Sequence, residues 1–228
     1  RGLRVGGRSL TWGGIPLRLS DEDFEGVETA EGRLDWPIRA ADLEADYAAL
    51  ERMFAVHGSA DGLSHLPDGA MQDPLPMTAA EQRFAAALSE QLGVTAIHSR
   101  GFGPHQPERD GPWPRSSSLG STLPRALATG RVALLSEHLV ERLLVAAGDD
   151  RAEGVVLINQ ADGQRHTVKA DLVVLAASTI QTVSILLRSQ HEGLREPSGR
   201  LGTRLMDHVS TSQFFAFADC DDQPQPPL

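Results

Sequence analysis

The glycine-rich N-terminal stretch is the first part of the sequence with residues suited to bind a ligand. Glycine has no Cβ, so its backbone can approach a bound group closely and adopt conformations closed to other residues. A flexible surface loop has the same composition, but the central tryptophan favours a loop that packs against something. The glycines are Gly2, Gly6, Gly7, Gly13 and Gly14, and they surround Arg8-Ser9-Leu10-Thr11-Trp12.

The histidines show no metal-binding pattern. The eight histidines include no His-x-x-x-His or Glu-x-x-His pair that would place two ligands on one helix face. His208 follows Asp207, and a carboxylate can orient an imidazole for acid–base work. Neighbouring side chains diverge on regular structure, so a structural role is favoured for His208. His105 lies in a Gly-Pro-rich loop and could line a pocket, although a solvated loop histidine is favoured.

Two common functional motifs are missing from the sequence. No Gly-x-Gly-x-x-Gly follows a strand to cradle a pyrophosphate, and no Gly-x-Ser-x-Gly forms a nucleophile elbow. Neither this pyrophosphate-binding loop nor a nucleophile elbow is therefore expected in this sequence, and the histidine spacing predicts no metal site.

Composition excludes several partners. The net charge is -10, from 21 basic and 31 acidic residues, which disfavours binding to nucleic acid or to an anionic membrane surface. No run approaches the ~20 apolar residues that a membrane span needs. Cys220 is the single cysteine, so no intrachain disulfide is expected. The sequence does not determine localisation; a cytoplasmic location is favoured.

Helices are expected in three places. Apolar residues at helical spacing predict a helix over 41–57, ended by Gly58. Thr78 and Glu81 form a capping-box pattern before a second helix that Gly93 closes. A third helix is expected to begin after Ser178 or Thr179. Residues 58–77 and 99–124 are rich in Gly, Pro, Asp or Ser and predict loops.

Short strands are expected in the second half of the chain. The candidates are residues 132–135, 139–146, 154–158 and 166–169, with turn signals at Asp149-Asp150 and Asp162-Gly163. The apolar run 171–177 then predicts a parallel strand buried on both faces. The pattern predicts a small antiparallel meander that leads into a buried strand and a helix.

Three blocks, in this order, resemble the glucose–methanol–choline (GMC) oxidoreductases. They are Val5-Gly-Gly-Arg-Ser-Leu-Thr-Trp-Gly-Gly14 with Asp23-Phe24 and Asp35-Trp36-Pro37, then residues 172–189, then 201–208. The resemblance is nearest to the branch of pyranose oxidases and the flavoprotein subunits of gluconate and fructose dehydrogenases. It implies an α/β (mixed) fold, in which an FAD-binding Rossmann-like domain is interleaved with a substrate domain, neither complete here.

The resemblance also implies cofactor-binding residues. The family's Gly-Gly loop runs beside FAD, which makes Gly6, Gly7, Ser9, Thr11, Trp12 and Gly13 candidates. Val140 matches the place of a main-chain contact to adenine, and Ala176-Ala177 match the tight turn near the adenosine. Ordinary strand packing also accounts for Val140 and Ala176. The implied domains are 1–35 and 118–205 on the FAD side, with 36–117 and 206–228 on the lid and substrate side.

The sequence departs from the family pattern at two positions. Thr11 stands where some pyranose oxidases have a histidine bonded covalently to the flavin, so non-covalent FAD is expected. The family's strand usually ends Ala-Gly, whereas this chain has Ala177-Ser178.

The expected function is oxidation of a CH–OH group in a sugar, glycoside or polyol. A histidine would take the hydroxyl proton, flavin N5 would accept the hydride, and oxygen or a quinone would reoxidise the flavin. The family's Gly-x-Gly-x-x-Gly strand is expected before Arg1 and its catalytic histidine after Leu228, so N- and C-terminal segments of the same protein are expected partners. The alternatives are a non-catalytic relative that binds a nucleotide or a partner, and a flavoprotein hydroxylase.

Overall fold

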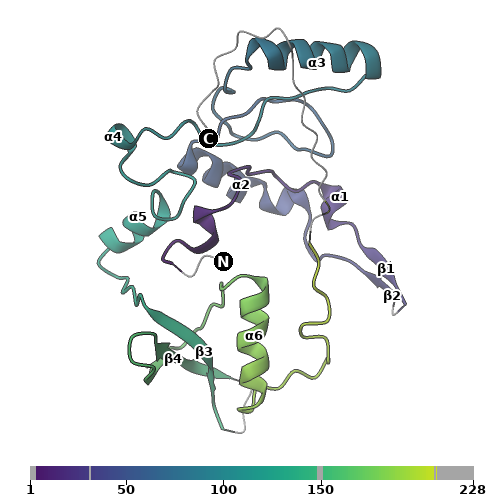
Figure 1. The fold of residues 1–228 in the computed structure, drawn as a ribbon. Helices are drawn as coiled ribbons and strands as arrows, with labels where there is room; N and C mark the ends of the chain where they lie inside the picture. The colour runs from purple at the N-terminus through teal and green to yellow at the C-terminus, as the bar shows by residue number, and fades with distance from the viewer. Residues whose placement is uncertain (1–3, 31, 148–150, 208, 210–228) are drawn as a thin grey trace. The chain divides into compact units, whose positions relative to one another are not determined.

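The chain divides into two compact units. The computed structural model describes residues 4–30, 32–147, 151–207 and 209 (Figure 1). One unit comprises the described residues up to Val132, and the other begins at Ala133. His208, Asp149, Asp150 and Cys220 lie outside the described residues. No described helix is both long and apolar enough to cross a lipid bilayer. The predicted division into FAD and substrate sides stays a prediction.

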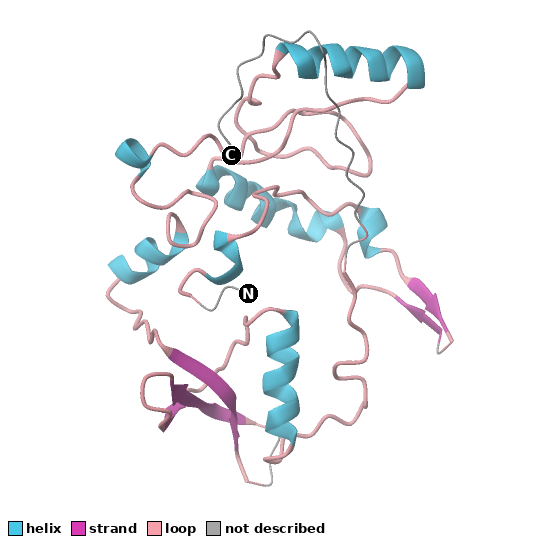
Figure 2. Ribbon diagram, in the orientation of Figure 1, coloured by secondary structure: helices cyan, strands magenta, loops and turns pink. Residues whose placement is uncertain are grey.

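The first unit consists mainly of helices joined by long loops (Figure 2). A hairpin of two exposed strands, β1 (Val27–Thr29) and β2 (Gly32–Leu34), follows the short helix α1. The apolar side chains buried in this unit are Phe24 and Val56, whereas several of its polar side chains are buried. Its helical elements are η1 (Gly7–Leu10), α1 (Asp21–Phe24), α2 (Ala40–Phe54), α3 (Ala79–Leu92), α4 (Pro107–Asp110) and α5 (Thr122–Ala128).

Local sequence signals explain where α3 begins and ends. The Thr78 hydroxyl accepts from the Glu81 N–H at 3.2 Å, and the Glu81 carboxylate accepts from the Thr78 N–H at 2.7 Å. This reciprocal pair is the predicted capping box. Gly93 ends the helix with φ of 63°, the left-handed conformation that suits glycine. Both expected boundaries of this helix are therefore confirmed.

The helix α2 ends earlier than expected. Ala55, rather than Gly58, takes the left-handed C-cap conformation with φ of 52°. The Val56 N–H then donates to the Glu51 carbonyl at 3.0 Å, which closes the last turn. The chain leaves the helix here because Val56 is buried and His57 pairs with another segment.

The second unit is a three-stranded antiparallel meander with one helix packed on it. The strands β3 (His138–Val145), β4 (Ala152–Asn159) and β5 (Arg165–Lys169) lie in the order β3-β4-β5, and α6 (Thr179–Gln190) contacts β3 (Figure 1). Their core contains Leu143, Val156, Leu157 and Ile185. Ser189 is fully buried; it accepts from the Leu143 N–H at 2.9 Å and donates to the Ile185 carbonyl at 2.7 Å. This serine links the helix to the sheet.

The expected buried strand over 171–177 is wrong for this structure. These residues form no strand, and the side chains of Leu172 and Val174 are 79% and 78% exposed. A parallel strand needs a neighbour to receive its backbone hydrogen bonds, and none of the described segments provides one. Residues 132–135 are also irregular rather than a strand. The three strands of the meander and helix α6 are confirmed.

Ser178 adopts a backbone conformation that serine rarely occupies. Its φ of 68° and ψ of 158° lie in a region used almost only by glycine, where another residue costs on the order of 1–3 kcal/mol. Its side chain makes no capping hydrogen bond, so truncating it loses none. Ser178, which stands where the resemblance leads us to expect a glycine, is therefore a strained residue.

We predict that Ser178→Gly stabilises the protein by about 1 kcal/mol, because the strain exceeds the entropy that glycine adds to the unfolded chain. Calorimetric Tm values of the variant and the parent check this. Ser184→Gly, in the middle of α6, is the matched control and should lower Tm. A Tm that falls for both variants would show that Ser178 is not strained.

Candidate functional site

The predicted glycine loop forms a tight turn that requires glycine. Gly6 and Gly7 both have positive φ, at 97° and 50°. A Cβ on Gly6 would lie 3.0 Å from the Leu10 side chain, whereas nothing lies within 4 Å of a Cβ on Gly7. Gly6 is therefore needed both for its backbone conformation and for its packing against Leu10. Gly7 is needed for its conformation alone, because the space where its Cβ would lie is empty.

Two side chains clamp this turn to the segment before α5. The Ser9 hydroxyl donates to the Gly6 carbonyl at 2.5 Å and accepts from the Ser118 N–H at 3.0 Å. The Trp12 indole Nε1–H donates to the Ser116 carbonyl at 2.9 Å, although the side chain is 44% exposed. The turn is thus held by hydrogen bonds that span more than 100 positions of sequence; the glycines and the tryptophan predicted a loop that packs against something, but not these partners.

The clamped turn leaves backbone donors available. Within the part of the chain that the structure describes, the N–H groups of Gly6 and Gly13 donate no hydrogen bond. Thr11 uses its hydroxyl locally, donating to the Arg8 carbonyl at 3.3 Å. Free N–H groups beside positive-φ glycines form a concavity suited to an anion or a polar ligand atom. This arrangement fits the diphosphate or the polar edge of a flavin nucleotide.

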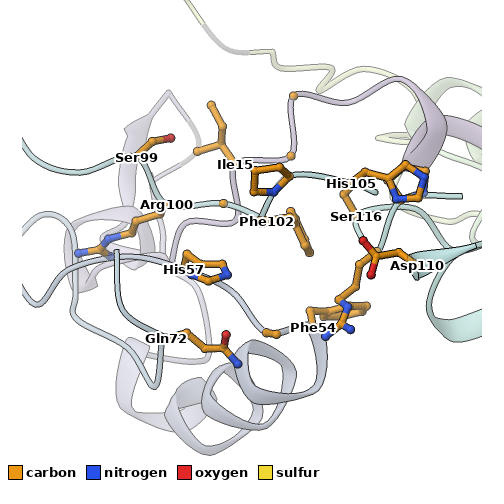
Figure 3. A pocket seen from close by; sticks show the side chains of 18 of the residues that line it. Ile15, Phe54, His57, Gln72, Ser99, Arg100, Phe102, His105, Asp110 and Ser116 are labelled. Carbon is orange, nitrogen blue, oxygen red and sulfur yellow. The ribbon is translucent and has the colours of Figure 1, made fainter. Parts of the chain in front are cut away.

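A cavity of about 290 Å³ adjoins the loop, bounded on one side by residues 12–15. We call it the Trp12 cavity. Its aromatic residues are Trp12, Phe54 and Phe102, whose rings meet edge to face with Phe102 in the middle, at centroid distances of 5.8 and 6.3 Å. Ile15 and polar side chains such as Gln72, Ser99 and Ser116 are among the other residues of the wall (Figure 3). Apolar surface with a few polar groups is typical of small-molecule sites.

Three short segments form the base of this cavity. His57 exchanges backbone hydrogen bonds with Gly101, with N···O distances of 2.8 and 3.0 Å. On its other side the Gln72 N–H donates to the Val56 carbonyl at 2.8 Å, and the Gly58 N–H donates to the Gln72 carbonyl at 3.2 Å. His57 is therefore the central residue of a small bridged unit that joins the end of α2 to both long loops.

The two histidines of the cavity, His57 and His105, lie on opposite sides of Phe102 in Figure 3. His57 Nδ1 is 2.8 Å from the Asp73 carbonyl oxygen, which can only accept, so this nitrogen carries a proton. His105 Nδ1 is buried and has no hydrogen-bond partner among the described residues. His105 is a half-exposed loop residue that lines the cavity, so both interpretations of it, the solvated loop histidine and the pocket residue, stay open.

The cavity also contains an internal ion pair. The Arg109 guanidinium binds the Asp110 carboxylate at 2.7 and 2.9 Å. These hydrogen bonds, together with one from the Gln106 N–H, lower the pKa of Asp110 to about 2. Asp110 is therefore a carboxylate at any working pH, and Arg109 is already neutralised by it.

A buried charge network supports the loops behind the cavity. Glu51 binds Arg18 through two hydrogen bonds of 2.7 Å and the Ala70 N–H through a third of 2.7 Å. Arg100 is 3% exposed; it donates to the Pro67 carbonyl at 2.6 Å and lies 3.4 Å from Asp61 and Asp68. Burial acts to raise the pKa of Glu51, but the hydrogen bonds from Arg18 and Ala70 outweigh it and hold the pKa below its ordinary value.

The remaining predicted residues belong to the second unit. Val140 is half-buried on β3, which is an edge strand, and a register shift separates its pairing from that of Arg142. Ala176 and Ala177 are exposed just before α6. The predicted cofactor residues thus fall into two groups, one in each unit.

Sequence reasoning missed His57, Gln72 and Phe102, which no motif marks. They come from loops far apart in the sequence and meet only through the bridged segments. The one local signal was Gly101-Phe102-Gly103, in which a glycine on each side leaves the aromatic side chain without a neighbouring side chain in sequence.

Comparison with known sequences places the chain in a family. A profile of the GMC oxidoreductases matches residues 2–210, and the chain belongs to that family. The resemblance of the three sequence blocks is thereby confirmed.

Three relatives are oxidoreductases by name. The chain is 30% identical to 2-methyl-1,2-propanediol dehydrogenase of Mycolicibacterium austroafricanum, 28% to C-glycoside 3-oxidase of Microbacterium trichothecenolyticum and 30% to 6'''-hydroxyparomomycin C oxidase of Streptomyces lividus. The alignments cover 90%, 97% and 82% of this chain, but 40%, 39% and 37% of the relatives. The chain therefore spans less than half of each relative.

We predict that Glu51→Gln destabilises the protein by about 3–5 kcal/mol, because it leaves Arg18 buried without a countercharge. Since the pKa of Glu51 is lowered by folding, its stabilisation is complete above the ordinary carboxyl pKa and is lost as pH falls through the folded value. The difference in Tm between parent and variant should be largest near neutral pH and shrink below about pH 4.

Thermal melts between pH 3 and 7 measure this difference. Glu44→Gln, on the exposed face of the same helix, is the control and should change Tm little at any pH. A Glu51→Gln difference that stays constant down to pH 3 would contradict the role given to the charge.

Proposed function

We propose that this chain supplies the flavin-side loop and part of the nucleotide-binding domain of an FAD-dependent oxidoreductase that oxidises a CH–OH group. The observation that carries the proposal is the clamped glycine turn, in which the N–H groups of Gly6 and Gly13 donate no hydrogen bond within the described residues and Gly13 lines a cavity. Membership of the GMC family supports FAD as the cofactor. Relatives named for a diol, a glycoside and an aminoglycoside support a small alcohol, polyol or sugar as the substrate class.

Each loop residue has a distinct part in this proposal. Gly6, Gly7 and Gly13 bring the main chain to the cofactor without a Cβ in the way. Ser9 and Trp12 fix the turn through their hydrogen bonds to residues 116–118, so that the donors are already oriented before the cofactor binds. Thr11 holds its hydroxyl on the Arg8 carbonyl. FAD, when bound, would supply the hydride acceptor.

The second unit would bind the adenosine portion. Val140 lies on an edge strand, where half of the N–H and C=O groups point away from the neighbouring strand and can bind an adenine edge. The neighbouring bulge is a feature often found beside functional sites. Ala176 and Ala177 are small and exposed, which leaves room for a nucleotide.

The chemical step would use the cavity to position the alcohol and exclude water. We assign no catalytic residue within 1–228, because none of these positions matches the family's catalytic block. The final electron acceptor is proposed to be oxygen or a quinone.

The visible spectrum of the purified full-length protein tests this proposal. We expect flavin bands that bleach when a polyol or glycoside is added without oxygen. Flavin bands that no alcohol bleaches would favour the non-catalytic relative, and bleaching by NADPH alone would favour the hydroxylase. A colourless protein that takes up no added FAD would overturn the proposal.

We predict that Gly7→Val lowers the ratio of bound flavin to protein by about tenfold or more. The valine Cβ would meet no atom of the chain, so its side chain would occupy the space in which the cofactor is proposed to lie. Gly62→Val is the matched control, since Gly62 has φ of 66° and equally open surroundings in the same unit. Both variants should lose about 1–2 kcal/mol of stability through backbone strain, but only Gly7→Val should lose flavin.

We predict that the flavin is held non-covalently, since the Thr11 hydroxyl is a poor nucleophile at neutral pH. After acid precipitation of the full-length holoenzyme the flavin should stay in the supernatant. Flavin retained by the pellet would contradict this.

A further inference from the structure

The loop that forms one side of the Trp12 cavity is fastened at both ends by the same side chain. At its start the Phe102 ring meets the Trp12 ring edge to face, with the centroids 5.8 Å apart. At its end the Ser116 carbonyl accepts from the Trp12 indole N–H at 2.9 Å. Residues 102–115 therefore form a closed loop whose two ends meet at Trp12. We call this loop the cap.

Between its ends the cap is bonded to itself. Among the residues that the structure describes, residues 103–113 form hydrogen bonds only with one another. The Asp110 carboxylate accepts from the Arg109 guanidinium and from the Gln106 N–H, and the Asp110 N–H donates to the Gln106 carbonyl at 2.7 Å. Prolines at positions 104, 107, 112 and 114 restrict the backbone further. The cap is thus a small stiff unit that can move without breaking its own hydrogen bonds.

The first end of the cap lies close against His57. A Cβ on Gly103 would be 3.2 Å from His57 Nε2, and no positive φ requires glycine at position 103. Glycine there therefore serves the close approach rather than the backbone conformation. His57 has little freedom to give way, because its Nδ1 donates to the Asp73 carbonyl and its backbone is bonded to Gly101. Any pressure at this contact would push the cap outward.

The cap faces the fixed wall of the cavity without bonding to it. In Figure 3 the cap residues His105 and Asp110 lie across the cavity from Gln72 and Ser99. Since residues 103–113 make no hydrogen bond outside the cap among the described residues, the clamp at its ends is what holds the cap in place. A compact loop with joined ends that covers a cavity has the form of a lid.

We propose that the cap opens and closes over the Trp12 cavity as one rigid body, and that Trp12 is the latch that holds it shut. Opening breaks the hydrogen bond from the Trp12 indole to Ser116 and separates the Trp12 and Phe102 rings, while the bonds inside the cap stay intact. Closing shields the cavity from water. The proposal concerns access to the cavity and is independent of which ligand the cavity takes.

Limited digestion of the full-length protein with trypsin, in excess FAD so that cofactor content is equal, tests the latch. Cleavage between Arg115 and Ser116 requires release of the second end of the cap, so its rate follows the open population when opening is fast. Trp12→Phe keeps a ring beside Phe102 but loses the N–H donor. We expect it to raise this cleavage rate about three- to tenfold, the range for one hydrogen bond.

Trp36→Phe is the matched control for the latch. Trp36 is 57% exposed in the same unit, and its indole N–H donates to none of the described residues. Its cleavage rate after Arg115, measured by mass spectrometry of the fragments, should equal that of the parent. Thermal melts should show that every variant is folded at the temperature of digestion.

Gly103→Ala tests whether the cap moves as one body. Its methyl group would crowd His57 at the first end, and we expect cleavage after Arg115, at the other end, to rise about threefold. Gln106→Ala is the control, because Gln106 is exposed in the cap and its side chain makes no capping hydrogen bond. Hydrogen exchange of the Asp110 amide, which is bonded inside the cap, should stay at the parent rate in all variants.

Four results would each contradict the proposal. Unchanged cleavage after Arg115 in Trp12→Phe would remove the latch, and unchanged cleavage in Gly103→Ala would show that the two ends move separately. Faster exchange of the Asp110 amide in Trp12→Phe would mean that the cap unfolds rather than opens. An equal rise in cleavage after Arg52, on α2, would mean that the whole unit loosens. None of these measurements uses an alcohol or flavin reduction, so the cap and the proposed oxidation can fail separately.

Discussion

Glu51 lies where three stretches of the chain meet, and its carboxylate binds two of them directly. It emerges from α2, binds Arg18 of the N-terminal segment, and accepts from the Ala70 N–H in the loop after the helix. Arg100 holds the same loop from the other side through the carbonyls of Leu66 and Pro67. In a unit whose buried apolar side chains are Phe24 and Val56, these polar contacts replace much of the hydrophobic core. A buried ion pair with several hydrogen bonds, such as that of Glu51 and Arg18, favours one arrangement of the loops around it.

The candidate site depends on this network because residues that line the Trp12 cavity come soon after the charged residues of the network in the sequence. Gly101 and Phe102 follow Arg100, and His57 comes shortly after Glu51, just past the end of α2. Once the charges are paired, the backbone exchange between His57 and Gly101 brings the aromatic cluster to the glycine loop. The loop itself is held by the hydroxyl of Ser9 and the indole of Trp12 rather than by apolar packing. Pre-formed donors and acceptors of this kind suit a polar ligand, since they need not be ordered when it binds.

Local signals predicted those parts of the fold that depend on neighbours in sequence. The capping box at Thr78 and the glycine cap at Gly93 were correct because both form within one helical turn. The meander was correct because hairpins pair adjacent segments. The apolar run 171–177 was misread as a strand of this structure, because a parallel strand depends on a partner that sequence pattern cannot supply. The sequence pattern predicted the end of α2 too far along the chain, because Val56 is buried and His57 pairs with distant segments instead of continuing the helix.

The sequence by itself determined the glycine turn, the caps of α3, the meander and the family, since these rest on residue types within short windows. It could not give the cavity. His57, Gln72 and Phe102 carry no motif, and they meet because buried charges and two backbone bridges from His57 bring distant loops together. Only the tertiary structure decided that the His57 ring donates from Nδ1 to the Asp73 carbonyl, because the orientation of an imidazole is set by whichever carbonyl the fold places beside it.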